Sequence, residues 1–168
     1  NNAMGMAISG YVAQNYGAGK QERIRQGVRA CLIQTETLNV LMCVGILLLR
    51  RQIVALFVTG ASEEIIAYSN GYLNGVAPFY VLLGLLLTYR TAVQSMQNTA
   101  APFAACMIEL VMRIGSTVLL TRAFGYFGVC IASPLAWAGA CCLLIPVYYR
   151  MMRAQGTQRT QMADVLRI

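Results

Sequence analysis

Residues 128–149 read GVCIASPLAWAGACCLLIPVYY, a run of apolar and small residues without a charged side chain. As an α-helix with a rise of about 1.5 Å per residue, this run can cross the ~30 Å hydrocarbon core of a bilayer. Three further full spans are expected at about 30–49, 76–96 and 103–121, and residues 1–16 are expected to end another span. Strict alternation of polar and apolar residues, which is typical of strands, does not occur. The sequence therefore predicts an all-α fold, a polytopic transmembrane helix bundle.

The composition argues against a soluble enzyme. Of the 168 residues, 58% are hydrophobic and 11% are charged, whereas a soluble domain has about 45–50% apolar and about 25% charged residues. The six cysteines form no C-x-x-C pair and the chain has no histidine. Neither a zinc site nor a cysteine–histidine nucleophile is therefore indicated. We expect no enzymatic activity, no metal site and no cofactor.

The basic residues predict the orientation of the helices. One group precedes the first full span and another follows the last: Lys20, Arg23, Arg25 and Arg29, and then Arg150, Arg153, Arg159 and Arg167. Four spans separate the two groups, so both lie on one side, which the positive-inside rule identifies as cytoplasmic. The net charge of +7 is thus a topology signal, and no nucleic-acid motif accompanies it. We predict a transmembrane lobe over 1–149 and a cytoplasmic basic tail over 150–168, in the plasma or inner membrane of the cell.

Glu109 and Arg113 lie midway through the third full span, where ionic side chains are costly. Their i, i+4 spacing puts them on one helical face, which Ser116 and Thr117 extend. We expect this face to be directed toward other helices or a wet cavity. Two interpretations stay open: Glu109 is a protonatable or cation-binding carboxylate in a transport pathway, or the two residues form an ion pair that holds the bundle together.

Glu36 and Asn39 are a second polar pair within an expected span, on one face of its helix. They are candidates for the cation or substrate pathway, and Glu36 either lines a cavity or extends its carboxylate to interfacial water. Phe79, Tyr80 and Met112 are candidates for the pliable wall of a drug-binding cavity. Packing between membrane helices explains these three residues equally well.

A short motif near the start of the chain points to a known family. Residues 12–20 read VAQNYGAGK, in which Gln14, Asn15, Gly17 and Gly19 follow the pattern Q-N-x-G-A-G-K. This motif resembles the second-lobe signature of the multidrug and toxic compound extrusion (MATE) family. Other stretches similar to that family are 77–80 (APFY), 109–114 (ELVMRI), 125–128 (GYFG) and 134–137 (PLAW).

The resemblance implies a twelve-helix secondary transporter of two six-helix lobes, which exchanges protons or sodium for small organic cations by alternating access. This chain would be the second lobe, comprising the end of helix 8 and helices 9–12, and is expected to be a fragment. The implied partners are the lipid bilayer, the N-terminal lobe of the same polypeptide, organic cations and the coupling ion. The implied function is multidrug efflux by cation-coupled antiport.

Two alternatives to efflux stay open. One is a flippase for lipid-linked oligosaccharides of the same superfamily, which should line its cavity with several basic residues to hold a pyrophosphate. Only Arg113 and Arg90 lie at depth in the expected spans, which disfavours this alternative. The other is a membrane scaffold that transports nothing and has inert polar pairs.

Overall fold

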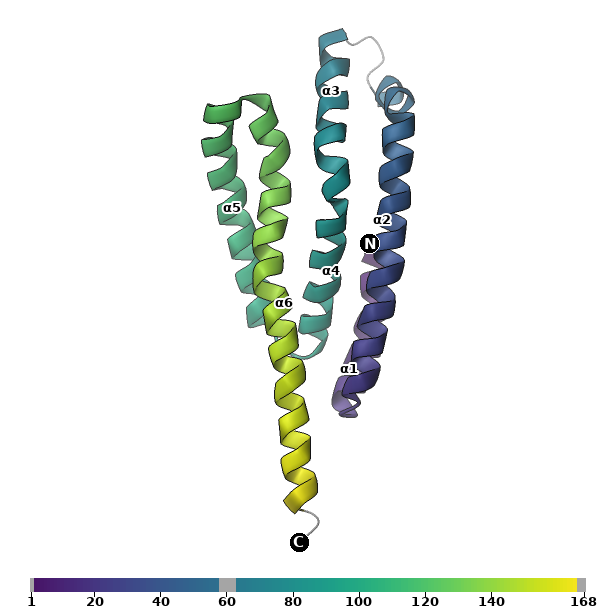
Figure 1. The fold of residues 1–168 in the computed structure, drawn as a ribbon, viewed down its shortest axis with the longest axis vertical. Coiled ribbons are helices and arrows are strands. Elements are labelled where there is room, and N and C mark those ends of the chain that lie inside the picture. The colour runs from purple at the N-terminus through teal and green to yellow at the C-terminus, as the bar shows by residue number, and fades with distance from the viewer. Residues whose placement is uncertain (1, 58–62, 166–168) are drawn as a thin grey trace.

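Long apolar stretches become long helices in this chain, as a computed structural model of residues 2–57 and 63–165 shows (Figure 1). In chain order these helices are α1 (Asn2–Gly17), α2 (Gln21–Phe57), α3 (Glu63–Val76), the 3₁₀ turn η1 (Ala77–Phe79), α4 (Tyr80–Ser95), α5 (Ala100–Phe124) and α6 (Tyr126–Val165). The residues so described include no strand. The predicted all-α bundle is confirmed.

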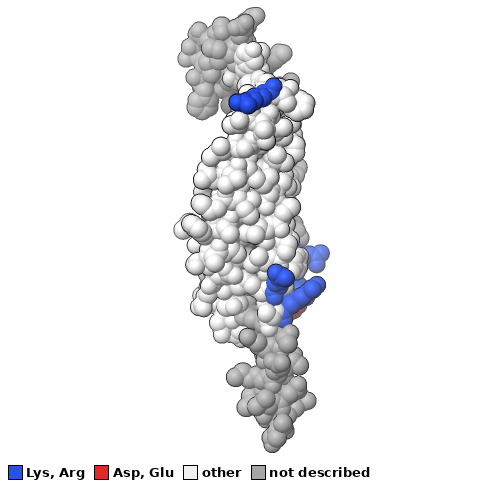
Figure 2. All heavy atoms as spheres, turned by 90° about the vertical axis from the view of Figure 1, so that its left-hand side faces the viewer, with Lys and Arg blue, Asp and Glu red and all other residues white. Residues whose placement is uncertain are grey.

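Among the described residues, four stretches are long and apolar enough to cross a membrane: Gln21–Leu49, Ile66–Ser95, Ala100–Phe124 and Tyr126–Ala154. The outer side of α5 shows why they need lipid, since Phe103, Val111 and Leu119 are 66%, 68% and 68% exposed. Figure 2 faces the side of the bundle on which α5 lies and shows basic groups toward the two ends of the described surface. The broad band between them is uncharged, as expected for a surface in contact with hydrocarbon.

The second span is longer than the predicted 76–96. The residues before Pro78 predict a short interfacial helix that leads into this proline. In the structure, however, α3 runs nearly in line with α4 through the turn η1 (Figure 1). Proline lacks a backbone N–H, and a 3₁₀ turn with Pro78 near its start accommodates this loss without ending the helical path. The apolar run from Ile66 to Ser95 can therefore span the membrane as one kinked unit.

Helix α4 is the centre of the described bundle, because it contacts α1, α2 and α6. Its buried residues Leu86 and Val93 belong to the same apolar core as Val12 of α1, Ile24 of α2 and Leu144 of α6. Helix α5 lies on the far side of α6 and packs mainly against that helix (Figure 1). After α4 the chain therefore crosses to the far side of the position of α6, forms α5 there, and then returns as α6.

A single residue, Gly125, joins α5 to α6. Its φ of +58° lies in the left-handed region, and its N–H donates to the Thr121 carbonyl at 2.9 Å. Three residues later, a Cβ on Gly128 would lie 2.3 Å from the backbone carbonyl of Leu120. Glycine at 125 and 128 therefore permits the tightest part of this hairpin.

The two basic segments lie at one end of the bundle. The turn between α1 and α2 carries Lys20, the start of α2 carries Arg23 and Arg25, and the C-terminal part of α6 carries Arg150 and Arg153. Figure 1 places both parts of the chain at the lower end, opposite the α5–α6 turn. The expected tail continues α6 as a helix to Val165, and its last three residues, 166–168, lie outside the described residues.

Candidate functional site

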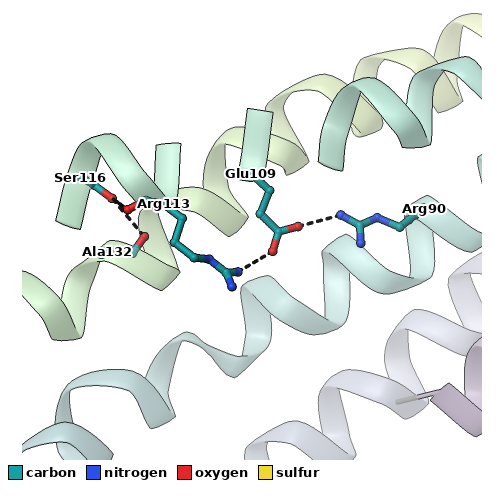
Figure 3. A network of polar contacts seen from close by, with 5 residues as sticks. All are labelled: Arg90, Glu109, Arg113, Ser116 and Ala132. Carbon is teal, nitrogen blue, oxygen red and sulfur yellow. Dashed lines mark hydrogen bonds and ion pairs between the residues drawn. The ribbon is translucent and has the colours of Figure 1, made fainter. Parts of the chain in front are cut away.

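Glu109 binds two arginines from two different helices. Its Oε2 lies 2.8 Å from Nη2 of Arg90 on α4, and its Oε1 lies 2.6 Å from Nη2 of Arg113 on its own helix, α5 (Figure 3). The exposed fractions of the side chains are 18% for Glu109, 22% for Arg90 and 47% for Arg113. The predicted candidates Glu109 and Arg113 are thus brought together, and Arg90 completes a triad with them.

Both oxygens of Glu109 accept a charge-assisted hydrogen bond in the triad. In the triad, two guanidinium groups face one carboxylate, so one positive charge is left over. Because α4 and α5 lie on opposite sides of α6, the Arg90–Glu109 contact is a polar link between helices that otherwise contact each other little. This geometry fits the interpretation of Glu109 as part of an ion pair that holds the bundle together.

Ser116 continues the polar face of α5 toward α6. Its hydroxyl is within hydrogen-bonding distance of the Arg113 carbonyl on its own helix and of the Ala132 carbonyl on α6, at 3.3 and 3.4 Å (Figure 3). Met112 also lies against α6, where a Cβ on Gly139 would overlap its sulfur. The predicted cavity-wall residue Met112 is therefore placed in the α5–α6 interface.

The second polar pair, Glu36 and Asn39, lies where α2 contacts α4. The Asn39 side chain is 6% exposed and donates to the backbone carbonyl of Tyr80 at 3.1 Å and to Oε2 of Glu36 at 3.5 Å. Both side chains lie against Gly84 of α4, because a Cβ there would be 2.6 Å from Oε1 of Glu36. The carboxylate of Glu36 therefore lies between α2 and α4, beside the side chain of Asn39.

The aromatic candidates lie at the break between α3 and α4. The Tyr80 ring stacks on Trp137 of α6, with centroids 6.2 Å apart and an interplanar angle of 28°. Phe79 is 39% exposed. A groove of about 300 Å³ beside them is lined by Leu38, Asn39, Met42, Ile46, Tyr80 and Leu83. Tyr80 and Asn39 thus belong both to this groove and to the polar contact with Glu36.

The motif residues of the sequence end α1 and form the turn into α2. The Asn15 side chain donates to the Tyr11 carbonyl at 2.8 Å, and the backbone carbonyl of Asn15 accepts from the N–H of Lys20 at 2.8 Å. Gly19 has a φ of +65°, which is the usual conformation of a residue just past a helix end. In this motif, Gly19 is the position that requires glycine, and Asn15 fastens the turn.

The comparison with family models decides the affiliation of the chain. The MatE model matches residues 2–119, which is well over half of its length. The chain belongs to the MatE family. This confirms the resemblance to the MATE family predicted from the sequence. A comparison with curated proteins found no match, and neither did a comparison with solved structures.

The MatE family is a family of transporters and not of enzymes. With its four apolar helices, this MatE chain is a multi-pass membrane protein. The matched region contains α1 to α4 and most of α5, and so holds both polar sites, the triad around Glu109 and the contact of Glu36 with α4.

Sequence reasoning missed two residues of these sites in the MatE chain. Arg90 was expected at depth in a span but was given no partner, and in the structure it binds Glu109. The signal was present, because an arginine within an apolar span needs an acidic partner, and a short connection joins α4 to α5. Gly84 gave no such signal, because its importance depends on which residues of α2 lie opposite it.

Proposed function

We propose that this chain is part of a multidrug efflux transporter that exchanges organic cations for protons or sodium. The observation that supports this is the presence of two carboxylates, Glu36 and Glu109, within the membrane-crossing helices of a MatE chain. Ionisable groups at such depth usually mark ion or substrate pathways. Glu36 and Asn39 are the pathway residues of this proposal, and the triad is the brace that keeps the helices around them in place.

The proposed transport cycle has two states of a cleft between this lobe and an N-terminal lobe of the same polypeptide. A cation that binds one state better than the other shifts the equilibrium toward that state. The organic cation and the coupling ion then compete for the cleft. In the proposed orientation, the basic turn before α2 and the C-terminal end of α6 face the cytoplasm of a cell whose plasma or inner membrane holds the protein.

A flippase for a pyrophosphate-linked lipid is not supported by the geometry. Such a site needs guanidinium groups that are free to bind phosphate. Arg90 and Arg113 are the arginines of the triad, and both bind Glu109.

The proposal is tested by expressing the complete transporter and measuring ethidium efflux from loaded cells or proteoliposomes. A gradient of protons or of sodium is imposed in separate experiments. Efflux that depends on one of these gradients supports antiport. The absence of gradient-dependent efflux of any organic cation would shift the interpretation to a scaffold that transports nothing.

A further inference from the structure

Two carboxylates, Glu36 and Glu109, lie deep within the described spans, and they differ in their counterions. Glu109 has a guanidinium group on each oxygen. Glu36 forms no ion pair with any lysine or arginine among the residues whose side chains the structure describes. Its Oε2 accepts one long hydrogen bond from Asn39, and its buried Oε1 has no hydrogen-bond partner there. An ionised carboxylate in apolar surroundings without a cation is costly, and taking up a proton removes this cost.

The position of Glu36 is imposed by the helix opposite. Gly84 leaves room for Oε1 against the backbone of α4, and Asn39 is anchored to the Tyr80 carbonyl at 3.1 Å. Asn39 and Tyr80 also line the groove of about 300 Å³, whose other lining residues are apolar. Glu36 is thus held between α2 and α4, next to a groove in the surface of the bundle.

The neighbouring titratable groups do not offer Glu36 a counterion. From α6, the Cys141 thiol lies within electrostatic range of Glu36, Arg90 and Glu109. From α4, Tyr80 takes part through its backbone carbonyl, which accepts from Asn39, whereas Arg90 is engaged with Glu109. On α2 itself, Cys31 is directed to Thr35 and to the Met4 carbonyl of α1.

We propose that Glu36 is the proton-binding group of this transporter and that the proton is its coupling ion. This rests on the proposed antiport function. The carboxyl O–H dissociates to a carboxylate and a proton, which leaves through water, when an organic cation arrives. Exchange of one proton for one monovalent cation keeps the charge of the site constant. Calcium and magnesium take about six or more oxygen ligands. Among the described residues, this contact supplies the oxygens of Glu36 and the amide oxygen of Asn39, beside the Tyr80 carbonyl, which already accepts from Asn39.

The test uses the complete transporter, purified in detergent in weakly buffered solution with a pH indicator. Ethidium is added, and ethidium binding and proton release are measured in parallel. Wild type should bind ethidium and release protons. Glu36→Gln should lose the proton release and bind ethidium more weakly, because the amide cannot become an anion, whereas Glu36→Asp should keep the proton release. Glu22→Gln, which changes an exposed carboxylate on the same helix, is the matched control and should release protons as wild type does.

A second pair of variants tests the position of the carboxylate. Gly84→Ala should reduce proton release because the added methyl group displaces Glu36 and Asn39. Gly45→Ala, at a position of α2 with no atom within 4 Å of the added Cβ, should not. Proton release by Glu36→Gln equal to that of wild type overturns the proposal, as does efflux driven by sodium without proton release.

A measurement on the unmodified protein covers the case in which Glu36→Gln does not fold. Dicyclohexylcarbodiimide reacts with protonated carboxyl groups in apolar surroundings, and mass spectrometry locates the adduct. We expect the adduct on Glu36, with less of it in the presence of ethidium. An adduct on Glu109 and none on Glu36 overturns the assignment. If wild type neither binds nor exports ethidium, the proposed antiport function itself fails, which is a result distinct from these.

Discussion

The guanidinium of Arg90 lies 2.8 Å from the carboxylate of Glu109, and this ion pair joins α4 to α5 around α6. The two residues are separated by a turn and parts of two helices, and each lies within an apolar span. Neither charge is tolerated there alone. Because Arg113 binds the other oxygen of Glu109, the loss of Glu109 leaves two unpaired arginines, whereas the loss of Arg90 leaves one intact ion pair.

We therefore expect Glu109→Met to destabilise the protein more than Arg90→Met. Removing the carboxylate should lower the free energy of unfolding by about 1–3 kcal/mol, because the partly buried guanidinium groups of Arg90 and Arg113 then have no counterion. The double variant should cost less than the sum of the two single changes. Equilibrium unfolding in mixed detergent micelles measures all three. Equal stability of Glu109→Met and wild type would contradict the role of Glu109 as a brace.

The α5–α6 hairpin should be sensitive to a single methyl group at Gly128. A Cβ there would meet the Leu120 backbone at 2.3 Å, and overpacking of this kind costs about 1–3 kcal/mol. Gly115→Ala is the control, because position 115 of α5 has no atom within 4 Å of the added Cβ. We expect Gly128→Ala to lower the midpoint of thermal unfolding and Gly115→Ala to leave it unchanged or raise it. The same midpoint for both variants would be at odds with the close approach.

Two glycines of the turn after α1 should respond differently to alanine. Gly19 has a φ of +65°, a conformation that costs an alanine about 1–2 kcal/mol. Gly17 is helical with open space around it, and alanine there favours the helix. We expect Gly19→Ala to reduce stability and Gly17→Ala to preserve it, as measured by unfolding in detergent. A greater loss from Gly17→Ala would show that the turn is closed in another way.

The orientation of the helices can be tested with single cysteines in a background from which the six native cysteines have been removed. A cysteine at Arg23 at the start of α2 should react with a membrane-impermeant maleimide only after the cells are opened. A cysteine at Arg122, near the opposite turn of the bundle, should react in intact cells. The positive-inside rule predicts this pattern, and the reverse labelling would invert the topology.

The sequence predicts features that depend on one helix at a time. The spans follow from length and hydrophobicity, and the proximity of Glu109 and Arg113 follows from their separation by four residues on α5. Contacts between helices follow neither from the hydrophobicity of a span nor from the spacing of residues within one helix. The ion pair of Arg90 depends on α4 and α5 lying on either side of α6, and the role of Gly84 depends on the register of α2 against α4.

The continuity of α3 with α4 was also beyond local reasoning. A proline in an apolar stretch is compatible with the end of a helix or with a kink. In this chain the helix is kinked and does not end, because the 3₁₀ turn at residues 77–79 continues its path and contacts such as the Tyr80–Trp137 stack support it. No residue of the stretch carries that information alone.

The one-residue connection between α5 and α6 has a consequence for biosynthesis. A helix that enters the lipid before the next helix is made needs a flexible connection to the part of the chain that is still in the translocation channel. Gly125 offers no such slack, and its backbone is already bonded to α5. We therefore expect α5 and α6 to settle in the lipid as one helical hairpin.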